Sequence, residues 1–450
     1  MRRRIFGLES EYGLTCTRNG GPPVPVEVLA RYLFEGVVPC TLTPNIFLPN
    51  GARLYVDTGF HPEYATPECD EILGLVACDR AGERIVEDLV RRVQRRLPEH
   101  GIAGHVRAYK NNTDSAGNSY GCHENYLVSR DTSFGYLVET LIPFLVTRQI
   151  FTGAGRVQQG PEGCQYHLSQ RALHISDELS GSTVSGRPII NTRDEPHADA
   201  GRFRRLHVIV GDSNMSEVAT YLKIGTTALV LDMIEDGFLA RDLRLESPIT
   251  ALRAISADPR LRERVPLRSG RSYTALEIQM SYLEAAEDHD RRQGGDPRAS
   301  AVLSRWRSVL TQLATDPMGA RREVDWVIKR ALIDRYIERQ QSSLEDPRAA
   351  LLDLQYHDVQ SDRGLYHLLA RHGEVERLVS DEAVERARHS PPQTTRARLR
   401  GDFIRRATLQ GREFQVDWAF VRTISGEDSQ TVLCQDPFVT YDERVEQLVA

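Results

Sequence analysis

Residues 50–69, with the sequence NGARLYVDTGFHPEYATPEC, bring an unusual density of ionisable side chains into one short stretch. After a turn, residues 53–57 alternate polar and apolar side chains, which is typical of a strand with one buried face. Arg53, Tyr55 and Asp57 would therefore project from the same face, roughly 6 to 7 Å apart. Such a face can bind a ligand and move protons, although a solvated surface strand is the alternative interpretation.

Further carboxylates flank this face in the sequence. Glu63 and Glu68 follow in a segment interrupted by prolines, where loops would aim their carboxylates at a ligand. Residues 5–13 form a second expected strand, on which Glu9 and Glu11 share a face. Two carboxylates on one strand face repel each other unless a cation lies between them. A divalent metal would supply that cation, and solvent or an arginine is the alternative.

A third segment, residues 204–217, is predicted to form a strand, a turn of small residues and the start of a helix. Arg205 and His207 would share a face of this strand, and Ser213 and Asn214 would lie in the turn. Because a helix N-terminus attracts anions, this segment is a candidate seat for a phosphate-bearing ligand.

A polar stretch at residues 110–126, KNNTDSAGNSYGCHENY, is too rich in Asn, Ser and Gly to build a core. Such a loop can cradle phosphates through backbone N–H groups, but an ordinary surface loop is the simpler interpretation. His123, Glu124 and Asn125 at its end would stand at the entrance of a strand and face the same cavity.

Together these segments suggest an open sheet with one functional face. Carboxylates on that face would hold Mg²⁺ against nucleotide phosphates, since hard oxygen ligands suit a hard cation. The arginines would neutralise charge on a transferred phosphoryl group. Asp57 has no evident cation of its own, so it is a candidate for the base that takes a proton from an incoming nucleophile. The residues thus indicate an ATP-dependent reaction at a carboxylate.

Composition narrows the class of protein. The chain has 450 residues and a formal net charge of -6, so we expect no binding to nucleic acid or to an anionic membrane. Without a membrane-spanning apolar run or a signal peptide, it is expected to be cytoplasmic. Its seven cysteines form no CxxC pair. Only Lys110, Lys223 and Lys329 are lysines among 57 Lys and Arg residues, which suits a lysine-modifying enzyme but also follows from nucleotide bias.

Apolar periodicity predicts the helices that would back the sheet. They cover residues 26–38, 79–97, 136–150, 218–234, 273–286, 301–313, 324–337 and 397–407. Strands are predicted again at 414–420 and 431–434. We therefore expect an α+β fold, with a large domain over residues 1–380 and a small C-terminal domain over residues 381–450.

Several long motifs resemble the Pup ligase and depupylase family, which is related to glutamine synthetase and γ-glutamyl-cysteine ligase. They are GLESEYG at 7–13, the stretches at 50–69 and 110–126, RPIINTRDEPHADA at 187–200, RRLHVIVGDSNMSE at 204–217, WVIKR at 326–330, PPQTTRARLRGDFI at 391–404 and TVLCQDPF at 431–438. These motifs agree in order along nearly the whole chain, so a chance match is excluded.

The resemblance implies a fold, an activity and a set of site residues. The fold would be glutamine-synthetase-like, with a curved, largely antiparallel sheet backed by helices and a small C-terminal domain on the nucleotide site. With ATP and Mg²⁺, the enzyme would phosphorylate the γ-carboxylate of the C-terminal glutamate of Pup, a small disordered protein tag. A substrate lysine would then attack and form an isopeptide bond that marks proteins for the proteasome. The family's motif positions imply Glu9, Tyr55 and Glu63 for magnesium, Arg53, Thr66 and Trp418 for ATP, and Asp57 as proton acceptor, with Glu11, Arg205, His207, Ser213 and Asn214 as weaker candidates.

Two other functions fit parts of this pattern. The depupylase relative hydrolyses the same bond, but it carries a long extra loop between its first two strands, and residues 13–51 leave no room for that loop. A non-catalytic, nucleotide-regulated scaffold that binds Pup would have no need for Asp57. In either case the expected partners are Pup and lysine-bearing proteins, and the chain is expected to be a monomer.

Overall fold

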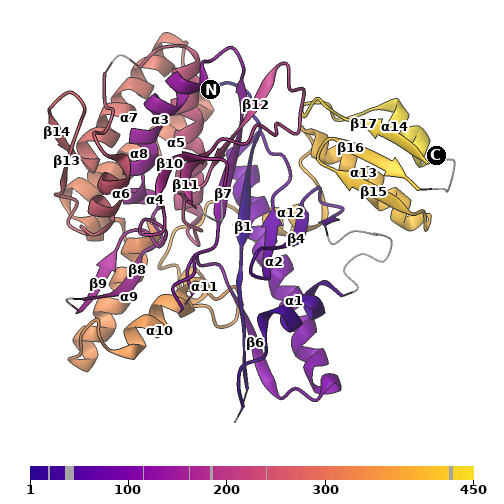
Figure 1. The fold of residues 1–450 in the computed structure, drawn as a ribbon, viewed down its shortest axis with the longest axis horizontal. Coiled ribbons are helices and arrows are strands. Elements are labelled where there is room, and N and C mark those ends of the chain that lie inside the picture. The colour runs from indigo at the N-terminus through magenta and orange to yellow at the C-terminus, as the bar shows by residue number, and fades with distance from the viewer. Residues whose placement is uncertain are drawn as a thin grey trace.

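An eight-stranded sheet forms the centre of the molecule (Figure 1). The computed structural model describes residues 1–18, 21–35, 45–114, 116–161, 163–182, 186–239, 241–424 and 429–450. Neighbouring strands are antiparallel, apart from the parallel first pair, and follow the order β10-β11-β12-β7-β1-β5-β4-β3. Their bounds are β1 (Phe6–Glu11), β3 (Ile46–Phe47), β4 (Arg53–Asp57), β5 (His61–Ala65), β7 (Cys122–Ser129), β10 (Asp177–Ser180), β11 (Pro188–Asn191) and β12 (Phe203–Val208).

Smaller sheets extend this frame. The paired strands are β2 (Gly13–Arg18) with β6 (Gly104–Tyr109), β8 (Arg156–Gly160) with β9 (Gly163–His167), and β13 (Arg264–Pro266) with β14 (Ser272–Thr274). β15 (Phe414–Asp417), β16 (Phe420–Thr423) and β17 (Gln430–Leu433) form an antiparallel sheet near the C-terminus. The predicted largely antiparallel α+β fold is therefore confirmed.

Helices cover one face of the central sheet (Figure 1). α2 (Ile72–Arg96) lies against β1, α5 (Glu217–Glu235) against β7 and α3 (Phe134–Thr147) against β11. Phe6 and Leu8 of β1 join their hydrophobic core, so Glu9 and Glu11 project from the opposite face. The other helices are α1 (Val26–Phe34), α4 (Gln149–Thr152), α6 (Pro248–Ser256), α7 (Ala275–Arg292), α8 (Pro297–Thr315), α9 (Asp325–Gln340), α10 (Pro347–Tyr356), α11 (Leu365–Arg371), α12 (Asp381–His389), α13 (Arg396–Leu409) and α14 (Glu443–Leu448), with short 3-10 helices at Leu97–His100 and Pro317–Ala320.

The structure corrects several boundaries. α2 begins at Ile72 rather than 79, because Ile72 and Leu75 extend its buried stripe. Residues 61–65 form strand β5 where loops were expected, so Glu63 is fixed on the sheet. Pro62 is tolerated there because β5 pairs with β1 only from Glu63 onward. The predicted helix at 26–38 ends at Phe34, and its last residues lie outside the described part of the chain.

The polar stretch at 110–126 is largely buried rather than a surface loop, and only residues 116–118 are exposed among its described residues. Lys110 and Asn112 are buried, and the Asn112 amide donates a hydrogen bond to Ser213 Oγ at 3.0 Å. Its last residues, from Cys122 onward, belong to strand β7. Buried polar side chains with hydrogen-bond partners of this kind stabilise a defined conformation, which composition alone does not reveal.

All three lysines are buried beneath this sheet and its helices. Lys110, Lys223 and Lys329 are exposed to 1%, 1% and 0%. The Lys110 ammonium pairs with Asp79 at 2.6 Å and with Glu83 at 2.8 Å. The Lys329 ammonium pairs with Asp353 at 2.5 Å, and that of Lys223 donates to the backbone oxygen of Asp212. The basic groups on the molecular surface are therefore arginines and the rare histidines.

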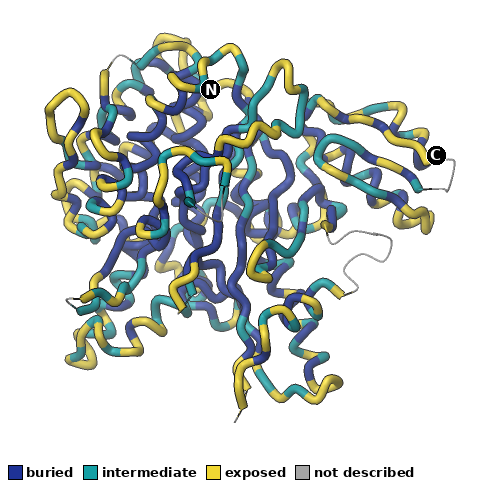
Figure 2. Tube along the Cα trace, viewed as in Figure 1, coloured by how far each residue is buried: buried dark blue, intermediate teal, exposed yellow. Residues whose placement is uncertain are grey.

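The C-terminal part has a hydrophobic cluster of its own. Residues from Leu399 to Val449 pack together with Phe47, whereas Val384 and Ala387 of α12 belong to the main core. Figure 2 shows the dark blue buried strands in the centre and a more exposed C-terminal lobe. The two hydrophobic clusters thus meet between Ala387 and Leu399. Within the described residues, no helix is both long and apolar enough to cross a membrane.

Candidate active site

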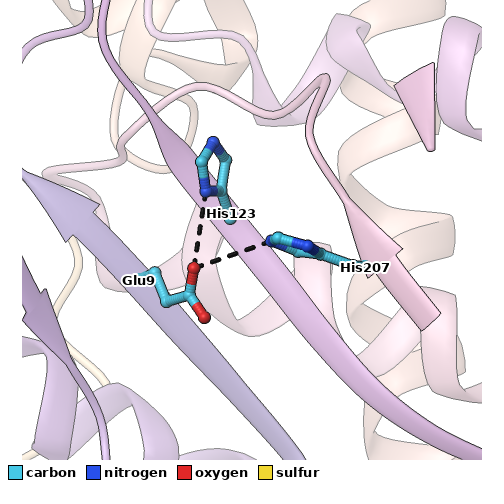
Figure 3. Close-up of side chains that lie close together, drawn as sticks. All are labelled: Glu9, His123 and His207. Atoms are coloured by element: carbon cyan, nitrogen blue, oxygen red, sulfur yellow. Dashed lines mark ion pairs between the residues drawn. The ribbon is translucent and has the colours of Figure 1, made fainter. Parts of the chain in front are cut away.

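Glu9 lies on the face of the sheet opposite the main hydrophobic core, close to His123 and His207 (Figure 3). Register pairs it with Ala65 of β5 on one side and with His123 of β7 on the other. Its Oε2 lies 3.4 Å from His123 Nδ1 and 3.6 Å from His207 Nε2, and His207 comes from β12. Arg205 Nη1 lies 3.7 Å from the other carboxylate oxygen. Atoms of Glu9, His123 and His207 lie within 4.8 Å of one another, so the three side chains can hold a cation together.

The charges of this cluster favour an ionised carboxylate and a neutral imidazole. Burial opposes ionisation of Glu9, but contacts with His123 and His207 hold the pKa of Glu9 well below its usual value. Burial lowers the pKa of His123 to about 4, so its ring is neutral near pH 7 and can offer a lone pair. Both ring nitrogens of His207 are buried without a hydrogen-bond partner among the described residues. The cluster is thus equipped to receive a ligand.

Glu11, Asp57 and Glu63 form a second cluster on the same face. Register pairs Glu63 with Glu11 and with Tyr55, and one carboxylate oxygen of each acid lies within 4.8 Å of the others. Burial and then the neighbouring Glu11 raise the pKa of Glu63 well above its usual value. Burial and then Asp57 raise the pKa of Glu11 to about 7. Crowded carboxylates with hard oxygen atoms fit a divalent cation such as Mg²⁺.

We expect Mg²⁺ to bind to the cluster of Glu11, Asp57 and Glu63 about tenfold more tightly at about pH 8 than at about pH 6. The pKa of Glu11 is raised to about 7 in the folded protein, so its proton stabilises the metal-free fold at low pH. That contribution is complete below the unfolded value of 4.5 and is lost as the pH rises through about 7. A cation must displace the proton at pH 6 but not at pH 8. Isothermal titration with Mg²⁺ at the two pH values measures the difference.

The Glu11→Gln variant is the control for this prediction, because the amide cannot titrate. It should bind Mg²⁺ more weakly and with a flatter pH dependence. Equal Mg²⁺ affinity of the unmodified protein at both pH values would show that the acid cluster does not bind the metal.

A hollow with a cavity volume of about 80 Å³ opens beside Glu9. Glu9 and Thr66 line it from the sheet, and Trp418 lines it from the C-terminal part. Trp418 packs edge-on against Phe47 with ring centroids 5.0 Å apart, and the Arg400 guanidinium lies 4.9 Å from the Trp418 ring centroid. A fixed aromatic side chain at the wall of a largely apolar hollow can stack with a nucleobase.

A second, larger hollow with a cavity volume of about 630 Å³ lies along the same face. His123, the partner of Glu9, lines this hollow and so connects the two. Its wall also carries acids and cations, namely Glu11, Asp57, Asp114, Arg171 and Arg187. The two clusters therefore lie between a hollow that suits a nucleobase and a larger, strongly polar hollow.

The structure groups the predicted magnesium residues differently from the expectation. Glu9, Tyr55 and Glu63 share one face, but Glu9 joins two histidines whereas Glu63 joins two acids. Burial and then Glu63 raise the pKa of Tyr55 well above its usual value, so the phenol stays neutral. Among the predicted nucleotide residues, Thr66 and Trp418 line the first hollow. The Arg53 guanidinium carbon lies 4.2 Å from the centroid of the Tyr55 ring. The Nε of Arg53 is buried and has no hydrogen-bond partner among the described residues.

Ser213 and Asn214 are not brought to either hollow. Ser213 accepts a hydrogen bond from the Asn112 amide, and Asn214 donates to Asp325 at 2.8 Å. The first turn of α5 is capped by Ser216 Oγ, while Asp325 accepts the Ser216 N–H at 2.9 Å. Protein groups thus occupy the helix N-terminus that the sequence suggested as a phosphate seat, because the segment is buried under the sheet.

Sequence reasoning missed two arginines and gave His123 too little weight. Alternation along β7 points His123 and Asn125 to the open face and Glu124 into the core, where Glu124 pairs with Arg148 at 2.9 Å. That alternation was a usable signal. Arg171 and Arg187 lie outside the regular strands and helices, so no periodic pattern indicates that they reach the second hollow.

Two candidate cation-binding clusters between a largely apolar hollow and a polar hollow fit an enzyme that binds a nucleotide beside an anionic substrate. The family model described as Pup-ligase protein matches residues 4–422, so the chain belongs to that family. The family membership expected from the sequence motifs is confirmed.

Relatives match over their full length. The chain is 56% identical over 452 residues to the Pup–protein ligase of Kribbella flavida, with 100% of both chains covered. It is 53% identical over 451 residues to that of Actinosynnema mirum, again with 100% of both covered. A crystal structure of Pup in complex with its ligase PafA matches 99% of this chain and 91% of that one, with 41% identity and a TM-score of 0.94. A structure of PafA with ADP matches 96% and 95%, with 40% identity and a TM-score of 0.86.

Proposed function

We propose that this chain is an ATP-dependent ligase that joins the γ-carboxylate of the C-terminal glutamate of Pup to the ε-amine of a substrate lysine. The observation that carries the proposal is one sheet face on which two candidate cation-binding clusters separate a small, largely apolar hollow from a larger polar hollow. Two reactants can therefore meet at the acids from opposite sides. The full-length similarity to proteins named Pup–protein ligase supports the same activity.

In this proposal the nucleotide occupies the first hollow. Trp418 would stack on the base, Thr66 would contact the nucleotide beside β1, and Arg53 and Arg205 would offset phosphate charge. The carboxylates of Glu9 and Glu63 fit as metal ligands, and the Tyr55 phenol would contribute a neutral oxygen. Mg²⁺ held there would neutralise the charge of the phosphates when bound.

The terminal glutamate of Pup and the substrate lysine would enter the second hollow. A carboxylate does not react with amines, so transfer of the ATP γ-phosphoryl group to it creates an acyl phosphate with a good leaving group. The lysine nitrogen then attacks the acyl carbon, phosphate departs and the isopeptide bond forms. The amine must lose a proton, because its usual pKa is near 10.4. Asp57 lines this hollow and would accept that proton.

We infer that the chain after about residue 395 acts as a small domain that completes the nucleotide site. Its own hydrophobic cluster and the positions of Arg396 and Trp418 on the wall of the first hollow support this role. The domain would thereby couple nucleotide binding to its own docking on the large domain.

One assay separates the proposed activity from its alternatives. The purified chain is mixed with ATP, Mg²⁺, Pup ending in glutamate and a lysine-bearing protein, and the products are resolved by mass. A covalent conjugate with one ADP formed per bond is expected. Release of Pup from a prepared conjugate without new conjugation would favour a hydrolase, and the absence of both reactions would favour a binding protein.

A further inference from the structure

Within the described residues, the side chain of Arg171 is a buried cation without an anionic partner in an ion pair. The residue is exposed to only 1%, and its Nε and Nη1 atoms have no hydrogen-bond partner within the described part of the chain. Burying a charge without a partner is costly, so buried cations in proteins are normally paired. A cation left in this state is prepared for an anion that arrives from outside.

The acids closest to Arg171 are already engaged. Asp212 accepts four hydrogen bonds, one of them from the Arg171 backbone N–H at 3.1 Å rather than from its guanidinium. Glu11 accepts the N–H of Gly121 at 2.6 Å and belongs to the acid cluster. The guanidinium is thus held near negative charge but is not hydrogen-bonded to it through Nε or Nη1.

Arg171 lines the second hollow, which is the proposed entrance for the tag. Arg187 lines the same hollow, and its Nη2 donates to the Ser119 backbone oxygen at 2.6 Å. Arg205, by contrast, lines the first hollow beside Glu9. The arginines of this face therefore fall into two sets. Arg205 lies at the hollow proposed for the nucleotide, and Arg171 and Arg187 lie at the second hollow.

We propose that Arg171, assisted by Arg187, binds the α-carboxylate of the terminal glutamate of the tag, an inference that rests on the proposed function. A terminal glutamate carries two carboxylates, and only the γ-carboxylate reacts. The α-carboxylate, separated from the reacting group by a short aliphatic chain, must also be buried when the γ-carboxylate reaches the acids. A guanidinium satisfies a carboxylate with two parallel hydrogen bonds. Arg171 therefore selects a chain-terminal glutamate over an internal one.

The test compares Pup ending in a free glutamate with Pup whose terminal α-carboxylate is a primary amide, which leaves the reacting γ-carboxylate intact. The unmodified enzyme should prefer the free acid by roughly a hundredfold in kcat/KM, as expected for a buried, charge-assisted contact. Arg171→Gln should lose about that factor with the free acid and show little further loss with the amide. This non-additivity identifies the two groups as partners.

Arg205→Gln is the matched control, because its guanidinium belongs to the nucleotide side. It should raise the KM for ATP while keeping the preference for the free acid. Arg171→Gln should melt no lower than the unmodified protein, since it removes an unpaired charge, and it should bind ADP normally. A merely structural arginine would instead lower the melting temperature.

Three results would overturn the proposal. The unmodified enzyme could react equally with the acid and the amide, or Arg171→Gln could keep the full preference for the acid. Equal slowing of both tags by Arg171→Gln would assign the side chain to the transferred phosphoryl group instead. None of these resembles failure of the proposed function, in which the unmodified enzyme would form no conjugate even with the free acid.

Discussion

Replacing Asp57 by Asn should reduce the rate of isopeptide formation by roughly 10²- to 10⁴-fold, the range expected for loss of a positioned base. The amide has nearly the same shape as the carboxylate but cannot accept a proton from the lysine. Asp57 lines the second hollow rather than the first, so ADP affinity should change little. Conjugation rates from resolved products and a calorimetric titration with ADP measure both quantities.

The pH and Mg²⁺ dependence of the variant separate two roles for this carboxylate, because Asp57 also lies within 4.8 Å of Glu11 and Glu63. If it accepts the proton, activity of Asp57→Asn should recover as the pH approaches the pKa of lysine, near 10.4. Recovery with excess Mg²⁺ instead would identify Asp57 as a metal ligand. Asp114→Asn, on the wall of the same hollow, is the control and should stay near full activity.

Replacing Glu68 by Gln should destabilise the docking of the C-terminal part by about 3 to 5 kcal/mol. Glu68 is buried and pairs with Arg396 at 2.8 Å and with Arg400, so the variant leaves two buried cations without their anion. Burial opposes ionisation, but Arg400 and Arg396 lower the pKa of Glu68 to about 2. The stabilisation is therefore present above about pH 4.5 and is lost as the pH falls through about 2.

Denaturant unfolding of the chain, followed by circular dichroism, measures the effect of Glu68→Gln on stability. Since Trp418 and Glu68 both line the first hollow, ADP affinity should fall as well. Glu446→Gln is the matched control in the same region. It breaks the half-exposed pair with Arg406 and should cost no more than about 1 kcal/mol. Equal stability of the two variants would mean that the Glu68 pair does not hold the C-terminal part in place.

The sequence allowed the faces of individual strands to be predicted, but not their order. Alternation in residues 53–57 and 5–13 correctly placed Tyr55, Asp57 and Glu9 on exposed faces, because strand periodicity is a local property. Which strands are neighbours depends on contacts that are distant in sequence. The pairing of Glu63 with Glu11 was therefore not predictable, and prolines suggested a loop where β5 lies between β1 and β4.

Buried polar residues are the ones whose surroundings the sequence did not reveal. Ser213 and Asn214 have the composition of a ligand-binding turn, yet the Ser213 hydroxyl accepts a hydrogen bond from Asn112 and the Asn214 amide nitrogen donates one to Asp325, both within the core. Arg171 shows the opposite case, since it lies in an irregular segment but reaches the second hollow. In both cases the tertiary partners decide the role, and composition carries no information about them.

The burial of Lys110, Lys223 and Lys329 has a consequence for an enzyme that modifies lysines. An enzyme that forms an activated acyl group could be modified by it on its own lysines, because these amines are always close by. Here, every side-chain amine is enclosed, ion-paired or hydrogen-bonded, and arginine, whose guanidinium stays protonated, supplies the positive charge of the surface. The chain should therefore escape self-labelling, and incubation with tag and ATP alone should leave its own mass unchanged.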